Sequence, residues 1–202
     1  MQGMRRHVHI AVALLAFAAL LAPAGGRADG GATSASARAK TASDRCQSAD
    51  ALPGQVSMAD AREAVLCLMN AQRTARGLRR LRAQPDLGEA AGRFARQMVR
   101  DRFFDHTSPG GSTMVSRIKG ASYLRDAVRW TVGENLAWGT GTKATPRATV
   151  DAWMHSADHR ENLLDRGFAD VGIGIATGAP AELQADETGG TYVTDFGRRV
   201  RQ

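Results

Sequence analysis

The feature that most constrains the fold is an apolar stripe near the middle of the chain. Between residues 87 and 99, apolar side chains recur at helical spacing, while arginines occupy the opposite face. Asp86 and Glu89 form a capping pair at the start of this segment. A helix with a single apolar face must bury it against another layer of structure. The members of the stripe are Leu87, Ala90, Ala91, Phe94, Ala95, Met98 and Val99.

Three further segments have helix signals. Ser57, with Asp60 three residues later, can cap a helix that Gly77 ends. A shorter helix is expected over 112–120. Thr145 followed by Pro146 opens another helix, because threonine caps well and proline suits the first helical position.

The pattern then changes from helical to alternating. Val128, Trp130 and Val132 alternate with polar residues and predict a strand that runs into Glu134. Residues 171–175 alternate with glycines, which suggests close packing over one face, and residues 191–196 predict a hairpin partner. Helices followed by strand, helix and hairpin indicate an α+β domain with a small sheet covered by helices.

The first residues indicate export. Arg5 and Arg6 precede a 12-residue apolar run and a small-residue cleavage site, the pattern of a secretory signal peptide over 1–28. The run is shorter than the roughly 20 residues of a spanning helix, although a retained anchor stays an alternative. We expect a flexible linker over 29–56, a folded domain over 57–197 and a basic tail over 198–202.

The mature charge limits the class of partner. Removal of residues 1–28 takes away three arginines and no acid, so the net charge falls from +7 to +4. This balance and the absence of nucleic-acid motifs argue against a nucleic-acid partner. Five arginines between positions 73 and 82 could bind an anionic wall polymer or lipid head group, or form a solvated helix end. We expect a secreted or envelope-associated monomer.

The chain has two cysteines, Cys46 and Cys67. An even pair in an exported chain most simply forms one disulfide. Such a bond closes a loop of about twenty residues and stabilises the fold by about 3 kcal/mol. It attaches the segment before the first helix to that helix.

Two histidines and a glutamate lie in the part of the chain richest in polar motifs. His106 follows the end of the second helix, Glu134 lies in a Gly-Glu-Asn motif, and His159 belongs to a short helical segment. Imidazole nitrogens and carboxylate oxygens bind zinc-like divalent ions. The same residue types also form buried hydrogen bonds that carry no chemistry.

Taken in order, these motifs resemble the CAP superfamily of cysteine-rich secretory, antigen 5 and pathogenesis-related proteins, in its bacterial exported branch. The similarity covers residues 57–197 and includes Asn70-Ala71-Gln72-Arg73, the His106 block, Gly133-Glu134-Asn135, Trp153 with His159, Gly172-Ile173-Gly174 and Thr194-Asp195-Phe196-Gly197. The resemblance implies a three-layer α-β-α sandwich with a small, largely antiparallel sheet. It also implies a cleft lined by a His, Glu, Glu, His tetrad.

The resemblance assigns His106, Glu134 and His159 to three tetrad positions. Ser156 stands where many eukaryotic members have the second glutamate, so one carboxylate is missing. Glu161 is close in sequence and is a possible replacement, although a surface position suits it better.

Three functions agree with these residues. The first is a binding or signalling module for an extracellular lipid, a cell-wall component or a protein. The second is a metal-dependent hydrolase or peptidase, in which a divalent cation such as zinc would activate water. The third is a structural polar network without a ligand. We favour the binding module, because no nucleophile motif such as G-x-S-x-G occurs.

Overall fold

The computed structural model describes residues 46–201. The expected signal peptide and most of the expected linker lie outside these residues. The elements follow the order α1 (Met58–Thr74), β1 (Arg82–Ala83), α2 (Pro85–Asp101), α3 (Met114–Gly120), β2 (Ala127–Thr140), the 3-10 turn η2 (Gly141–Ala144), α4 (Pro146–His155), α5 (Ala157–Leu164), β3 (Asp170–Thr177) and β4 (Gly189–Arg201).

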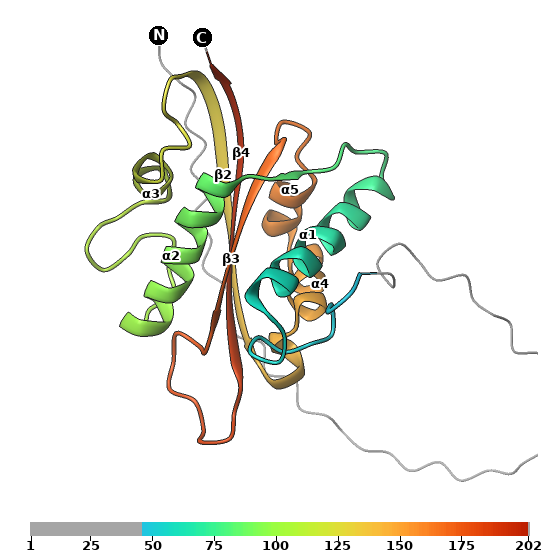
Figure 1. Cartoon of the computed structure of the whole chain (residues 1–202), viewed down its shortest axis with the longest axis vertical. Helices are drawn as coiled ribbons and strands as arrows, with labels where there is room; N and C mark the ends of the chain where they lie inside the picture. Colours follow the sequence, from blue (N-terminus) through green and yellow to red (C-terminus); the bar gives the residue numbers. More distant parts are fainter. Residues whose placement is uncertain (1–45, 202) are drawn as a thin grey trace, which may run out of the picture.

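The sheet is the middle of three layers. Its strand order is β1-β3-β4-β2, and every pair is antiparallel except β1 with β3. Helices α2 and α3 cover one face, and α1, α4 and α5 cover the other (Figure 1). This is the expected α-β-α sandwich with a small, largely antiparallel sheet.

Helix α2 is the predicted amphipathic helix, with one difference at its start. Gln84 is the N-cap, and its side chain accepts a hydrogen bond from the Leu87 amide. The expected capping pair thus lies inside the first turns, because Pro85 takes the first helical position. Phe94 is 1% exposed, as its place in the stripe predicts.

The close packing that the glycines of β3 suggested is the contact with α2. A Cβ at Gly172 would lie 2.0 Å from the Leu87 carbonyl carbon, and one at Gly174 would lie 2.2 Å from that of Ala91. Helix α2 therefore rests directly on the strand backbone.

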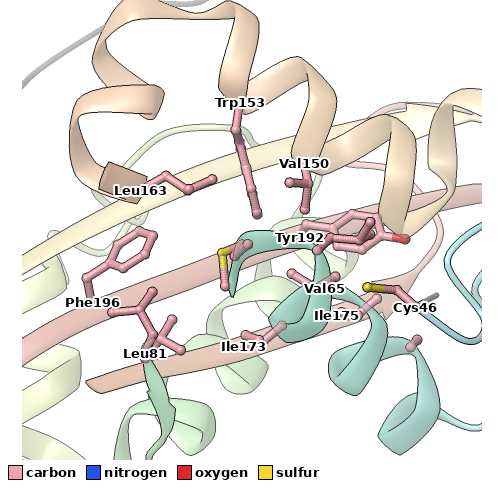
Figure 2. Packing of buried hydrophobic residues seen from close by; sticks show 14 of the residues in the cluster. Cys46, Val65, Leu81, Val150, Trp153, Leu163, Ile173, Ile175, Tyr192 and Phe196 are labelled. Carbon is pink, nitrogen blue, oxygen red and sulfur yellow. The ribbon is translucent and has the colours of Figure 1, made fainter. Parts of the chain in front are cut away.

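The opposite face of the sheet carries the largest apolar cluster (Figure 2). Trp153 from α4 and Leu163 from α5 pack there against Tyr192 and Phe196 of β4. The predicted disulfide between Cys46 and Cys67 is present, and Cys46 is itself buried in this cluster. The segment after Cys46 is thus part of the folded domain.

Strands β2 and β4 are longer than the alternation pattern indicated. Glu134 lies near the middle of β2, opposite Asp195, and not at a strand end. Residues 198–201, expected as a basic tail, continue β4 and pair with the start of β2. The pairing explains the difference, since backbone hydrogen bonds to β2 outweigh the polar composition of this segment.

Arg73 departs from the solvated cluster in which the sequence places it. It is 1% exposed and donates to the carbonyls of Arg79, Leu163 and Asp165, so it joins α1 to the end of α5. Burial lowers the pKa of this guanidinium, because the charged form loses its hydration. Across residues 46–201, no helix is long and apolar enough to span a bilayer.

Candidate functional site

The three residues predicted for the site come from three elements. His106 follows the end of α2, Glu134 lies in β2, and His159 lies on α5. His106 Nδ1 donates to Glu134 Oε1 over 2.7 Å. His159 makes no hydrogen bond to either, but His106 is close enough for its charge to lower the pKa of His159. The structure thus joins two of the predicted residues directly and places the third nearby.

Arg117 on α3 binds the second oxygen of Glu134. Its Nη2 lies 2.6 Å from Glu134 Oε2, and both side chains are at least nine-tenths buried. The guanidinium also lies over the Phe94 ring, with its central carbon 3.3 Å from the ring centroid. A charge-assisted pair in so dry a setting is strong, because water competes little for its partners.

Arg117 also fixes the loop that carries His106. Its Nη1 donates to the carbonyl of His106 over 3.1 Å and to that of Ser112 over 2.9 Å. The loop has no regular secondary structure, so these bonds position the imidazole above Glu134. One arginine therefore orients both the glutamate and the histidine.

Asp195 is a buried carboxyl group beside this pair. It is fully buried, lies opposite Glu134 across the β2 and β4 ladder, and has no hydrogen-bond partner for either carboxylate oxygen. Burial raises its pKa well above the ordinary value, the nearby charge of Glu134 raises it further, and Arg117 opposes both. The Nε atom of Arg117 is likewise buried without a partner.

His159 is held by a hydroxyl group. Its Nδ1 lies 2.8 Å from Ser156 Oγ, within hydrogen-bond distance. Ser156 occupies the N-cap position of α5 but makes no side-chain cap bond, because its hydroxyl is engaged with the imidazole. Asn135 of β2 donates to the His159 carbonyl, and Asn162 donates to the side chain of Asn135. These bonds fix α5 against the edge strand.

The surroundings of His159 disfavour its charged form. Burial is the largest cause of its lowered pKa, the charge of His106 adds to it, and Asp158 opposes both. We therefore expect His159 to be neutral at pH 7.

Ser156 and Glu161, the two residues considered for the position of the missing tetrad carboxylate, have different surroundings. Ser156 contacts His159, whereas the side chain of Glu161 is exposed on α5 and makes no hydrogen bond to the residues described for this site. Sequence reasoning missed Arg117 and Asp195. Arg117 lies three residues after Met114, on the side of the helix expected to be buried, and Asp195 interrupts an apolar strand. Both are charged residues at core positions, which is the signal that could have revealed them.

The geometry around Glu134 differs from that of the expected cation site. Both oxygens of Glu134 are already bonded, one to His106 and one to Arg117. Among residues 46–201, no group of three or more His, Cys, Asp or Glu side chains is arranged to hold a metal ion. In this arrangement the three predicted ligands do not fit a divalent cation. Binding of a metal ion by the protein stays a prediction, which a zinc titration described below tests.

Residues 66–188 match the profile of the cysteine-rich secretory protein family, CAP. The chain belongs to the CAP family. A curated relative, the uncharacterized protein YkwD of Bacillus subtilis (strain 168), is 32% identical over 139 residues, which are 68% of this chain and 50% of YkwD. The uncharacterized membrane protein YlbC of the same organism is 27% identical over 112 residues, 55% of this chain and 30% of YlbC. The chain thus spans half or less of the length of these relatives.

Solved structures show the same fold. An extracellular protein containing an SCP domain from Bacillus anthracis superposes with a TM-score of 0.53 at 21% identity, over 74% of this chain and 45% of that protein. An outer surface protein from Borrelia burgdorferi gives a TM-score of 0.55 at 21% identity, over 72% of this chain and 97% of that protein. At this identity the likeness supports the CAP sandwich and carries no ligand assignment.

Proposed function

We propose that the protein is an exported binding module whose ligand places a polar group between His106 and His159. One observation carries this proposal: each ring uses Nδ1 for a bond to its own chain, and no hydrogen bond within the described residues uses Nε2 of either ring. The His106 side chain is 24% exposed. Each imidazole is thus oriented from behind and presents a free nitrogen, which is how proteins position histidines for a ligand.

The charge of the site limits the chemical groups that the ligand can carry. Arg117 neutralises Glu134, and Asp195 is a fully buried acid with a raised pKa. Because His106 donates through Nδ1, its Nε2 can accept a hydrogen bond, whereas Nε2 of His159 can donate or accept, depending on which nitrogen carries the proton. A hydroxyl or amide group of an extracellular lipid, a cell-wall component or a protein suits such a pair, because it can donate to one ring and accept from the other.

The test is recovery of the ligand with the protein. The secreted protein is purified from a culture of its own host, extracted with organic solvent, and compared by mass spectrometry with His106→Ala and His159→Ala. We expect a compound that accompanies the wild type and is lost from both variants. His155→Ala is the matched control, because His155 is exposed and its Nδ1 bonds only the Asp151 carbonyl. Equal recovery from all four proteins would contradict the proposal.

Hydrolysis is a second candidate, favoured by the bond between His106 and Glu134. A carboxylate that holds Nδ1–H of a histidine stabilises the imidazolium formed when Nε2 takes a proton from water. The bond of His159 to Ser156 gives no comparable stabilisation of an imidazolium, because a hydroxyl carries no negative charge. Turnover of ester or peptide substrates that disappears in Glu134→Gln and persists in Ser156→Ala would establish this activity. Absence of turnover by the wild type would exclude hydrolysis of the substrates tested.

A further inference from the structure

We propose that the guanidinium of Arg117 is the resident cation of this site and keeps divalent ions away from Glu134. The chain itself thus supplies the positive charge that the carboxylate needs. This proposal concerns the same site as the proposed function, because it also involves His106 and Glu134. It does not depend on the ligand that the protein binds.

The contacts of Arg117 are those of a bound cation in a built site. It touches Glu134 Oε2 at 2.6 Å and two backbone carbonyls, those of His106 and Ser112, at 3.1 and 2.9 Å. An aromatic face, that of Phe94, covers it. Carboxylate oxygen, carbonyl oxygen and an aromatic face are the groups that stabilise a positive charge in proteins.

Two physical effects exclude a second cation. A divalent ion that used Glu134 would have to break a buried ion pair, and it would then lie within a few ångströms of a guanidinium that cannot lose its proton. The other nearby carboxyl group, Asp195, has no exposed surface. Neither carboxylate is therefore available to a metal ion while Arg117 is in place.

This proposal differs from a purely structural role for Arg117 in what its removal creates. If Arg117 only supported the loop, its loss would weaken the fold and leave metal binding unchanged. If Arg117 is the resident cation, its loss opens a carboxylate beside an imidazole, which is a usable pair of zinc ligands.

The experiment is isothermal titration calorimetry with zinc at neutral pH, on the mature wild type and on Arg117→Met. We expect zinc to bind Arg117→Met at least about tenfold more tightly, the size of effect seen when partners of metal ligands change. Arg199→Met is the matched control. It removes an equal charge from another arginine that lies over an aromatic ring, that of Tyr123, away from Glu134. This control should bind zinc as weakly as the wild type.

A second variant tests whether the gain in zinc affinity depends on Glu134, and it keeps the test valid if Arg117→Met misfolds. In the double variant Arg117→Met, Glu134→Gln the buried ion pair is removed as a whole, so we expect it to fold and to lose the gain in zinc affinity. If Arg117→Met alone is unfolded, circular dichroism should show that zinc restores it, because binding to the native state stabilises that state.

Three results would overturn the proposal. The first is equal zinc affinity of wild type and Arg117→Met. The second is a double variant that binds zinc as tightly as Arg117→Met does. The third is an Arg117→Met protein that neither folds with zinc nor binds it. Each is distinct from failure of the proposed function. The ligand recovered from the host depends on His106 and His159, whereas the zinc gain depends on Arg117 and Glu134.

Discussion

The two histidines of the site are held in different ways. His106 rests on a carboxylate that is itself paired with a buried arginine, whereas His159 rests on the hydroxyl of Ser156. The His106 side is therefore a network of charges on the face of the sheet that α2 and α3 cover. The His159 side is a neutral arrangement built on α5 and the amide side chains of Asn135 and Asn162.

The difference shows on which side of the site a mutation should cost the most stability. Removal of one member of a buried charge network leaves another charge without a partner, which costs several kcal/mol. Removal of a neutral hydrogen bond at a half-exposed position costs far less. Only His106 is held by a buried ion pair, so the two sides of the site should respond differently to mutation and to pH.

The largest expected effect is on the charged side. Glu134→Ala leaves Arg117 buried without its carboxylate, so the free energy of unfolding should fall by about 3–5 kcal/mol. Urea denaturation at pH 7 measures the change. A loss of under about 1 kcal/mol would mean that the pair is already open to water and that the two sides of the site are alike.

The next effect concerns the pH dependence of stability. The raised pKa of Asp195 means that the native protein holds a proton that the unfolded chain releases above about pH 4. The contribution of this group to stability is thus complete below that pH and is lost as pH rises, by at most about 1.4 kcal/mol per pH unit until the native carboxyl ionises.

Asp195→Asn removes this titration, because an amide has no proton to release. The stability of the variant relative to wild type should increase between pH 5 and pH 7 in paired urea denaturation curves. Parallel pH profiles for the two proteins would show that Asp195 is ionised in the native state.

A smaller effect is expected on the neutral side. Ser156→Ala removes the hydroxyl that holds His159, and the free energy of unfolding should fall by about 1 kcal/mol. The lowered pKa of His159 arises chiefly from burial, so it should stay below the ordinary value of about 6.5 in the variant. NMR titration of the imidazole measures it. A pKa that rises to the ordinary value would show that the serine controls the charge of His159.

The smallest effect is expected for Glu161→Ala. The side chain is exposed, so stability should change by less than about 0.5 kcal/mol. The NMR titration of His159 should be the same as in wild type. A shift of that titration would assign to Glu161 the carboxylate role that Ser156 leaves vacant.

The fold could be predicted well from the sequence because its signals are local. The apolar stripe of α2, the caps at Ser57 and Thr145, and the glycines of β3 each express a requirement of a single element or a single contact. The ends of β2 and β4 could not be predicted, since their pairing depends on two segments that are far apart in sequence.

The site could be predicted only in part. His106, Glu134 and His159 were found through motifs, and the structure brings the first two into contact. The roles of Arg117 and Asp195 depend on which charges meet after folding. A sequence pattern shows that a charged residue occupies a core position, but not which partner neutralises it.

The glycines of β3 also bear on the position of His106, although they lie outside the site. Because α2 touches the strand backbone at Gly172 and Gly174, no side chain separates the helix from the strand at these two positions. The loop that carries His106 begins at the end of α2, whereas Glu134 belongs to the sheet, so the helix-to-sheet distance acts on this pair together with the bonds of Arg117. We expect a methyl group added at Gly172 or Gly174 to push α2 away from the sheet and to weaken the bond between His106 and Glu134. The alignment of His106 with Glu134 thus depends also on two positions that lie outside the site.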